Sequence, residues 1–372
     1  MIAKKNKLKE LIIFHPSIEG GGAEKNLFLI SNYLSEKLQK VTAISADKKS
    51  NKFVKKVNLL TPFFKVNENI GRPIKYFLCL LILLKKCIFD KKNICLLSFQ
   101  ANIYVIMICY ILGVNIISRS NSSPSGWSKN FLKNLVFNFF LKKADVIIVN
   151  SKDFQRELNN KFGVKSKLIL NPFHFKEIKI KSKKHVSSNF FKKKSLKLVN
   201  VARLTDQKDH LTLLKALEIA VKFRKIQLII VGRGVFYKQI QNFINEKKLK
   251  ENIILVGYQE NPFKFINLCE IFVLTSAFEG HPNVLIEAQS LKKYIISSDC
   301  PTGPKEILGN GKYGSLFKVG DYKKLSKLLI NFKMNRKNKN KILEGYKTLK
   351  MYDYKKNCKA YLDIVLPFLK YS

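Results

Sequence analysis

Short, continuously apolar runs recur along the chain, and stretches with helical spacing of apolar residues separate most of them. A strand without polar alternation is typical of a parallel sheet that helices cover on both faces. The alternation of such strands with helices therefore predicts an α/β fold with doubly wound parallel sheets. The predicted strands are Leu11–His15, Val41–Ser45, Ile94–Ser98, Asn115–Arg119, Val146–Val149, Lys167–Leu170, Lys197–Val201, Gln227–Val231, Ile253–Val256, Ile271–Leu274 and Tyr294–Ser297.

The length of the chain and a shift in its composition predict two domains. At about 150 residues per domain, 372 residues are enough for two. Residues 176–195 are rich in Lys and Ser without an apolar period, so we expect an interdomain linker there. The first domain would then span residues 1–175 and the second residues 196–353, and Tyr354–Leu369 has the apolar spacing of a final helix.

One stretch is long enough to cross a bilayer, because Asn93–Ser118 has no charged residue over 26 positions. Polar side chains interrupt it at Ser98, Gln100 and Asn102. We expect this stretch to form a buried strand, a helix over Ile103–Leu112 and a second strand, in preference to a transmembrane helix.

The charge of the chain is strongly positive, with 69 basic and 26 acidic residues and a formal net charge of +43. Of the basic residues 62 are Lys and only 7 are Arg, whereas sequence-specific readers of nucleic acid depend on the bidentate geometry of Arg. Two explanations stay open. One is the compositional bias of an AT-rich genome, and the other is a basic face for an anionic membrane surface, a nucleotide or a phosphorylated substrate.

The cysteines and the N-terminus favour a cytoplasmic protein. Seven cysteines, an odd number without a C-x-x-C pair, argue against a disulfide framework or a zinc site. Residues 1–10 are basic and lead into a short apolar segment, without the long apolar region and small-residue cleavage site of a secretory signal.

Three loops that follow predicted strands carry residues suited to an anionic ligand. Gly20–Gly22 stand between a strand and a helix, where the backbone can approach a ligand closely; a tight structural turn is the alternative. Arg203 and Lys208 share one strand-to-helix loop, where a guanidinium fork and a point charge can converge on a diphosphate; solvated loop charges are the alternative. Gly232 follows the next strand and is a further site of close approach.

The most informative motif runs from Thr275 to Ala288, follows a buried strand and opens a helix. Glu279 lies in the loop, and Glu287 lies about one turn into the helix on an otherwise apolar face. A carboxylate there costs free energy unless it is paired, and two ribose hydroxyls are suitable donors; a cap or a salt bridge is the alternative. The backbone N–H groups at the helix start would favour an anion.

Four motifs make the chain resemble the retaining glycosyltransferases of family 4, which have the GT-B fold. They are the Gly20–Gly22 loop, Arg203 with Lys208, the pair Glu279-x7-Glu287 and the stretch Asp299–Ile307. The resemblance covers nearly the whole chain and implies two facing Rossmann-like domains with a cleft between them, the C-terminal helix 354–372 joining the first domain. The last stretch is similar to members that assemble bacterial surface polysaccharides and glycan–lipid precursors from UDP-sugars.

The resemblance also implies a role for each matching residue. The implied catalytic residues are Arg203 and Lys208, which would hold the donor diphosphate, and Glu279, which would contact the donor sugar. The implied donor-binding residues, with Glu287 on the ribose, are Gly232, Glu279, Gly280, His281, Pro282, Asn283, Val284 and Glu287. The acceptor side of the cleft would contain Gly20, Gly21, Gly22, Arg119 and Asn121.

The chain departs from the family at one place. Many members carry a His near the reacting sugar, whereas residues 118–124 here read SRSNSSP. We expect Arg119 and Asn121 as substitutes, and His15 and His281 are the other nearby candidates. A histidine that ends a strand, such as His15, is more often structural.

The resemblance therefore implies a hexosyl- or N-acetylhexosaminyltransferase that uses a UDP-sugar and a lipid-linked or saccharide acceptor. The sequence has no Asp-x-Asp, so we expect neither a metal ion nor another cofactor. The expected location is the cytoplasmic face of an anionic inner membrane, as a peripheral protein, with no nucleic acid as partner. Two alternatives stay open: a UDP-sugar epimerase of the same fold, and a non-catalytic basic protein that binds membranes or nucleic acid.

Overall fold

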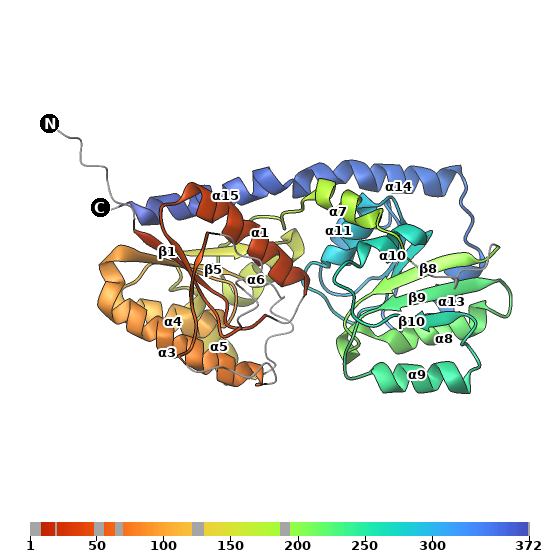
Figure 1. Cartoon of the computed structure of the whole chain (residues 1–372), viewed down its shortest axis with the longest axis horizontal. Coiled ribbons are helices and arrows are strands. Elements are labelled where there is room, and N and C mark those ends of the chain that lie inside the picture. Colours follow the sequence, from red (N-terminus) through yellow and green to blue (C-terminus); the bar gives the residue numbers. More distant parts are fainter. Residues whose placement is uncertain are drawn as a thin grey trace. The chain divides into compact units, whose positions relative to one another are not determined.

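The computed structural model of the chain describes residues 9–18, 21–47, 56–63, 70–120, 130–186 and 194–370 (Figure 1). The chain divides into two compact units. Unit 1 comprises Met1–Phe173 and Tyr352–Ser372, and unit 2 comprises His174–Met351. Each unit contains one parallel β-sheet.

The sheet of unit 1 reverses its strand order beside the first strand. Its strands are β1 (Glu10–Phe14), β2 (Val41–Ile44), β3 (Asn58–Leu60), β4 (Ile94–Ser98), β5 (Ile116–Arg119), β6 (Val146–Val149) and β7 (Lys167–Leu168). The spatial order is β3-β2-β1-β4-β5-β6-β7. Leu11 of β1 pairs in parallel with Val41 on one side and with Cys95 on the other, so the switch point lies between β1 and β4.

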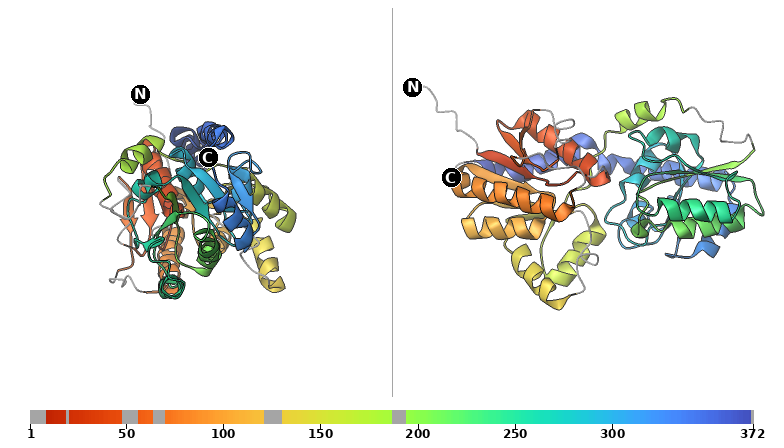
Figure 2. Two further views of the ribbon diagram at one scale, coloured as in Figure 1. Left: turned by 90° about the vertical axis from the view of Figure 1, so that its right-hand side faces the viewer. Right: turned by 60° about the horizontal axis from the view of Figure 1, so that its bottom comes forward.

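Helices cover both faces of this sheet (Figures 1 and 2). They are α1 (Gly22–Lys37), α3 (Arg72–Asp90), α4 (Asn102–Leu112), α5 (Phe131–Leu141), α6 (Lys152–Phe162) and α15 (Tyr354–Leu369). Successive strand residues enter opposite cores, as a period of two requires. Ile12 and Leu96 pack with α3, α4, α5 and α6, whereas Leu11 and Cys95 pack with α1 and α15.

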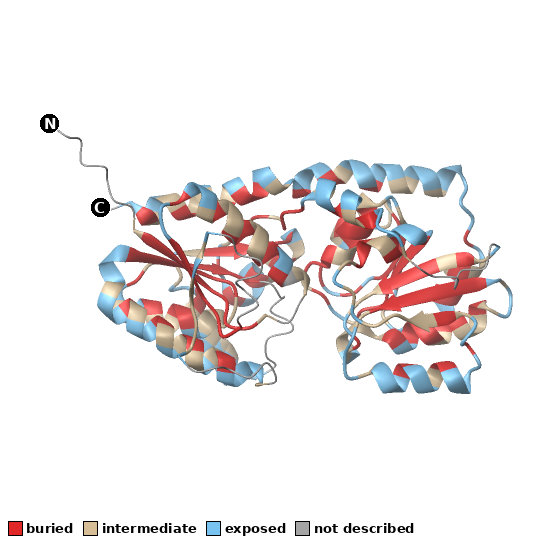
Figure 3. Ribbon diagram, in the orientation of Figure 1, coloured by how far each residue is buried: buried red, intermediate tan, exposed pale blue. Residues whose placement is uncertain are grey.

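The sheet of unit 2 has the same parallel design. Its strands are β8 (Leu196–Val201), β9 (Ile226–Val231), β10 (Ile253–Leu255), β11 (Ile271–Leu274), β12 (Tyr294–Ser298) and β13 (Ser315–Phe317). Their order is β10-β9-β8-β11-β12-β13, so the switch point lies between β8 and β11. Every residue of β11 and β12 is buried, and so is every residue of β9, which Figure 3 shows in red. The helices are α7 (Phe175–Ser182), α8 (His210–Ala220), α9 (Tyr237–Glu246), α10 (Phe263–Leu268), α11 (Asn283–Ser290), α12 (Pro304–Ile307), α13 (Tyr322–Ile330) and α14 (Arg336–Thr348).

The predicted strands all lie in these two sheets, with their ends displaced by at most two residues. The uncharged stretch Asn93–Ser118 forms β4, α4 and β5, which confirms the prediction of strand, helix and strand. Across the described ranges, no helix has both the length and the apolar character that a bilayer crossing requires. The edge strands β3 and β13 are absent from the predictions, because each has only three residues and no extended apolar run.

The prediction of a linker over residues 176–195 is wrong for its first part. Residues up to Ser182 form α7, which packs on α10 and α11 within unit 2. Ile178 is buried there, and the side-chain amides of Asn261 and Asn267 donate to the carbonyls of Lys181 and Ser182 at 2.8 and 3.3 Å. Two buried residues, Ile178 and Ser182, and two terminal carbonyls with hydrogen-bond partners stabilise α7. The Lys-rich composition of the segment does not indicate this helix.

The helix expected over Tyr354–Leu369 is α15, and it packs in unit 1. Its residues Cys358, Tyr361 and Val365 are buried in the same core as α1. The backbone N–H of Phe173 donates to the carbonyl of Tyr352 at 3.0 Å, which ties the end of the first segment of unit 1 to the start of the second.

Candidate active site

The carboxyl edge of the sheet in unit 2 brings together the two loops that carry the strongest motifs. One loop follows β8 and contains Arg203 and Lys208, and the other follows β11 and contains Glu279. Because β8 and β11 are neighbours and parallel, both loops leave the sheet at the same edge, at its switch point. Ligands of open α/β sheets bind at this position.

Lys208 and Glu279 form an ion pair between these loops. The Lys208 ammonium contacts Oε1 of Glu279, and the two side chains are only 13% and 8% exposed. Ser276 Oγ donates to the same carboxylate oxygen at 2.7 Å. An ammonium has three donors, so Lys208 can keep Glu279 and still bind a further oxygen.

Backbone and side-chain hydrogen bonds hold the two loops together. The N–H of Ala277 donates to the carbonyl of Gln207 at 2.8 Å, and the Gln207 amide donates back to the carbonyl of Phe278 at 2.9 Å. Thr275 Oγ1 donates to the carbonyl of Lys208 at 3.0 Å. These bonds fix Lys208 and Glu279 relative to each other, which is the preorganisation that an electrostatic site requires.

The stretch Asp299–Ile307 supports the Glu279 loop from behind. The N–H of Glu279 donates to the carbonyl of Pro301 at 2.6 Å, and Thr302 Oγ1 donates to the carbonyl of Gly280 at 2.7 Å. Gly303 has a φ of +97°, and a Cβ there would lie 2.7 Å from Cδ of Pro282. The close approach to Pro282 explains the glycine at position 303.

Helix α11 begins at Asn283 directly after this loop and carries Glu287 in its second turn. The Glu287 side chain is almost completely buried, with 2% of the residue exposed. His281 and Asn283 are also buried. Pro282 has no backbone N–H, so of the segment Gly280–Val284 it alone offers no donor to an anion.

Gly232 follows β9 and lies against the Arg203 loop. A Cβ at Gly232 would lie 1.8 Å from the carbonyl oxygen of Ala202, the residue before Arg203. The glycine is therefore required for the close approach of two chain segments of unit 2. This packing role stands beside the expected role in donor binding.

We expect Gly232→Ala to destabilise the protein by about 3 kcal/mol, because the backbone at Ala202 must move to admit the methyl group. The measurement is the free energy of unfolding in urea. Gly257→Ala is the matched control: Gly257 has a φ of +69°, but nothing lies within 4 Å of its Cβ position, so only backbone strain of about 1 kcal/mol is expected. Equal losses in the two variants would contradict the steric argument.

In unit 1 the glycine loop forms the cap of α1. The N–H of Gly21 donates to Oε2 of Glu24 at 2.8 Å, and α1 begins at Gly22. A carboxylate of the chain itself therefore lies at this helix N-terminus, which is the arrangement of the structural turn that we kept as the alternative. Gly20 and Asn121, two further candidates on the acceptor side, lie outside the described residues.

Arg119 is not available to a substrate, so its prediction as a substitute for the family histidine is wrong. It is completely buried at the end of β5. Its guanidinium donates to the Tyr361 hydroxyl and to Oδ1 of Asn171, each at 2.7 Å, and lies over the Phe99 ring. A residue of α15 thus ties Arg119 to the core, and its role is to join three segments of unit 1.

Two buried histidines stay neutral in the folded chain. Burial, with the nearby charges of Arg119 and Arg72, lowers the pKa of His15 from 6.5 to about 3. Burial and the charge of Lys208 lower the pKa of His210 to about 4. His210 Nε2 lies 3.1 Å from Oδ1 of Asn200, which fixes the ring at the start of α8.

Because of these two histidines, we expect the free energy of unfolding to fall in acid. Below about pH 6.5 the unfolded chain binds protons that the folded imidazoles do not, so each histidine lowers stability as pH falls toward the folded pKa. Each should cost about 2 kcal/mol between about pH 7 and pH 5. Urea unfolding at both pH values should show a smaller loss for His15→Gln than for the parent chain. An unchanged loss would contradict this prediction.

Three residues that position the Glu279 and Lys208 loops were not predicted as site residues. Ser276 and Thr302 contact the Glu279 loop through their hydroxyls, and Gln207 joins it to the Lys208 loop. All three lie inside segments that the sequence marks as motifs. Serine and threonine close to Glu279 in these motifs could have indicated the two hydroxyl contacts, because a buried carboxylate and the loop around it need hydrogen-bond donors.

No cluster of metal ligands stands out in the parts of the chain that the structure describes. Within these ranges, no group of three or more His, Cys, Asp or Glu side chains is placed to hold an ion. The seven cysteines are free and buried, as the odd count without a C-x-x-C pair predicts for a chain without a disulfide framework.

Two units that each contain one doubly wound parallel sheet have the GT-B fold, which the solved structure reported below shares. The family model described as Glycosyl transferases group 1 matches residues 181–348, nearly all of unit 2. This match and the relatives named below support a GT-B glycosyltransferase.

Two sequence relatives and one solved structure show what the chain is similar to. An uncharacterized glycosyltransferase of Methanocaldococcus jannaschii is 36% identical over 47% of this chain, and the match spans only 44% of that relative. The N-acetylgalactosamine-N,N'-diacetylbacillosaminyl-diphospho-undecaprenol 4-alpha-N-acetylgalactosaminyltransferase of Campylobacter jejuni is 27% identical over 90% of this chain and 94% of its own length. Anabaena HepE, crystallised with UDP and glucose, superposes with a TM-score of 0.77 at 16% identity, over 96% of this chain and 99% of HepE.

Proposed function

We propose that the chain is a retaining glycosyltransferase of family 4 that transfers a hexose or an N-acetylhexosamine from a UDP-sugar to a lipid-linked or saccharide acceptor. The observation that carries the proposal is the Lys208–Glu279 pair at the switch point of unit 2, beside the start of α11. Relatives with names of this kind, and a structural neighbour crystallised with UDP and glucose, support it. The expected process is the synthesis of surface polysaccharide or glycan–lipid precursors.

The proposed chemistry assigns the leaving diphosphate to cations of the β8 loop. This assignment is supported by the exposure of Arg203 on this loop and by the ion pair of Lys208 with Glu279. Charge that develops on the departing UDP would be stabilised by these two side chains and by backbone N–H groups at the start of α11. Retention of configuration implies attack from the face of the leaving group, with a phosphate oxygen as base.

Glu279 and Glu287 would select the donor. The Glu279 carboxylate, oriented by Ser276 and Lys208, would accept hydrogen bonds from sugar hydroxyls. Glu287, buried one turn into α11, would accept from the two ribose hydroxyls. Hydrogen bonds to a charged acceptor contribute about 1.5–3 kcal/mol each, which is enough to make a ribonucleotide the preferred donor.

A panel of nucleotide sugars tests the proposal directly. UDP-glucose, UDP-galactose and their N-acetylhexosamine counterparts, with ADP-glucose and GDP-mannose for comparison, would be added to the purified chain. We expect at least one UDP-sugar to raise the thermal unfolding temperature and to release UDP when an acceptor is present. Conversion of one UDP-sugar into another without transfer would favour the epimerase, and absence of any effect would contradict the donor site.

We expect transfer to persist in excess EDTA. The sequence has no Asp-x-Asp pair, and the proposed site meets the diphosphate with Arg203 and Lys208. The initial rate of UDP release should be the same with and without the chelator. A rate that falls to background and returns with added Mn²⁺ or Mg²⁺ would show that a metal ion takes part.

A further inference from the structure

The outward side of α3 carries an apolar stripe that no part of the described chain needs for packing. Cys79, Leu83 and Cys87 form the buried stripe of this helix. A second apolar stripe lies on the opposite side of the helix, with residues alternately three and four positions apart. Its members and their exposed fractions are Ile74 (53%), Phe77 (62%), Leu81 (48%), Leu84 (38%) and Ile88 (51%).

Helices α4 and α5 continue this apolar surface. On α4, Tyr104 and Ile111 are 56% and 70% exposed. They lie on a different side of the helix from the buried residues Val105, Ile106 and Cys109. On α5 only Leu141 is buried. Its exposed apolar side chains share one side of the helix: Phe131 (73%), Leu132 (69%), Leu135 (50%), Val136 (48%) and Phe139 (52%).

The three helices lie next to one another on the same face of the sheet (Figures 1 and 2). Of the 27 large apolar side chains exposed on the described residues, 14 belong to these three helices, which have 41 residues. Such a concentration is far from the scattered apolar exposure that is normal for a protein surface. We name the outward side of α3, α4 and α5 the α3–α5 face.

Lysines border this face, and carboxylates are nearly absent from it. Exposed cations lie on or directly after α3 and α5: Arg72, Lys85, Lys91, Lys92, Lys133, Lys142 and Lys143. The sequences of the three helices contain a single acidic residue, Asp90, which pairs with Lys86 at 2.7 Å. Lysine can extend its charge toward phosphate groups while its alkyl chain stays on apolar surface.

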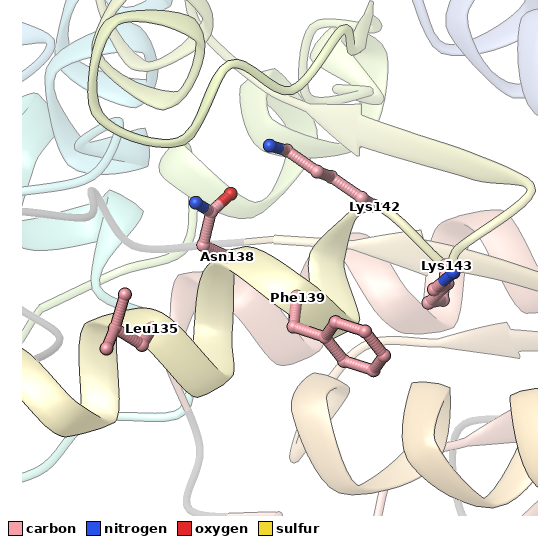
Figure 4. Close-up of a pocket in the computed structure, with 5 residues that line it drawn as sticks. All are labelled: Leu135, Asn138, Phe139, Lys142 and Lys143. Atoms are coloured by element: carbon pink, nitrogen blue, oxygen red, sulfur yellow. The ribbon is translucent and has the colours of Figure 1, made fainter.

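Aromatic and cationic groups meet where α4 and α5 adjoin. The Tyr110 and Phe139 rings contact edge to face with centroids 6.3 Å apart, and the Lys143 ammonium lies 4.8 and 5.1 Å from the two centroids. Figure 4 shows Phe139 and Lys143 beside Leu135, Asn138 and Lys142, which together line a pocket at the end of α5. Aromatic rings beside cations are typical of the headgroup region of a membrane.

We propose that the α3–α5 face docks on an anionic lipid bilayer, with its apolar stripe in the upper acyl region and its lysines among the headgroups. Docking through this face would bring the chain to the membrane in which a lipid-linked acceptor lies. The biological use of the docking face therefore rests on the proposed function. Charge complementarity selects the bilayer: an isologous dimer through this face would place its own lysines against those of a second copy. Apolar burial combined with attraction to anionic lipid is the binding mode of interfacial helices.

Vesicle flotation with the full chain tests the proposal. We expect the chain to float with vesicles of phosphatidylcholine and phosphatidylglycerol, and far less with phosphatidylcholine alone. Phe131→Gln/Leu135→Gln should weaken binding by about tenfold per residue. Lys142→Gln/Lys143→Gln should weaken it by about fivefold per lysine, and binding should fall as salt rises.

Matched controls remove equal groups from unit 2. Phe223→Gln/Val235→Gln changes two apolar side chains that are 71% and 86% exposed, and Lys337→Gln/Lys339→Gln removes two exposed lysines of α14. Both controls should float like the parent chain. Phe131→Leu/Leu135→Met keeps the apolar surface and should retain binding, with an unchanged unfolding temperature in every variant.

Three outcomes would overturn the proposal: no flotation of the parent chain, equal loss in variants and controls, or a dimer that only the Phe131→Gln/Leu135→Gln change dissociates. Flotation needs no donor, so its failure leaves the proposed transferase testable. UDP release with a soluble acceptor should be the same in the parent chain and in the flotation variants. Loss of that activity without loss of flotation would count against the proposed function alone.

Discussion

Replacing Lys208 by methionine is expected to lower the rate of sugar transfer by about 100- to 1000-fold, the effect of removing one donor aimed at developing charge. Methionine keeps most of the apolar length of the side chain and removes the ammonium that contacts Glu279. The measurement is the initial rate of UDP release at saturating donor. We expect the turnover number to fall more than the affinity for donor, because the leaving diphosphate gains charge in the transition state.

The same substitution leaves a buried carboxylate without its cation, so it should also cost about 3 kcal/mol of stability. The double variant Lys208→Met/Glu279→Gln removes both charges and should recover most of this stability without recovering transfer. Lys247→Met is the matched control, because Lys247 pairs with Glu218 at 3.2 Å outside the four motifs, with a side chain that is 43% exposed. Recovery of activity in the double variant would show that Lys208 acts only through the structure.

Most of the fold follows from short-range patterns in the sequence. Strands such as Ile94–Ser98 and Ile271–Leu274 are continuous apolar runs, and the structure buries every residue of both. Two three-residue edge strands, β3 and β13, have no such run: β3 is Asn-Leu-Leu and β13 is Ser-Leu-Phe. The third, β10, is Ile-Ile-Leu and was predicted. A Lys-rich segment conceals α7 for a related reason: Ile178 is buried by packing on distant helices, which composition does not indicate.

The sequence likewise predicts one part of the candidate site correctly and another part wrongly. Lys208 and Glu279 each stand out in a loop after a strand, and the parallel sheet brings those loops together. Arg119 also ends a strand, yet Tyr361, a residue 242 positions away in the sequence, takes its guanidinium into the core. Local patterns predict which loops share an edge, whereas burial by a remote helix depends on tertiary packing.

The excess of lysine now has two different explanations in the molecule. Lys208 is mostly buried and paired, whereas Lys142 and Lys143 border an exposed apolar face. Net charge alone does not distinguish a membrane surface from a compositional bias. The coincidence of exposed apolar stripes with lysines, and with a single carboxylate, is what separates α3, α4 and α5 from the remaining surface.

Glu287→Ala is expected to reduce transfer by at least about 100-fold, because the two hydrogen bonds that we propose between the ribose hydroxyls and this carboxylate would contribute about 3–6 kcal/mol together. The loss should appear mainly as a weaker affinity for UDP-sugar. Isothermal titration with UDP measures it without any acceptor. Glu287→Gln keeps the volume of the side chain at a position that is 2% exposed, and should lose somewhat less.

Two controls distinguish binding of the donor ribose by Glu287 from a purely structural role of this residue. Glu246→Ala removes an exposed carboxylate of α9 in the same unit and should leave UDP affinity unchanged. A 2′-deoxy-UDP ligand removes one of the two hydroxyls, so the parent chain should bind it more weakly than UDP. In Glu287→Ala the two ligands should bind alike, since the carboxylate that distinguishes them is gone. Equal discrimination in the parent chain and the variant would assign the ribose to another residue and leave Glu287 a structural role in α11.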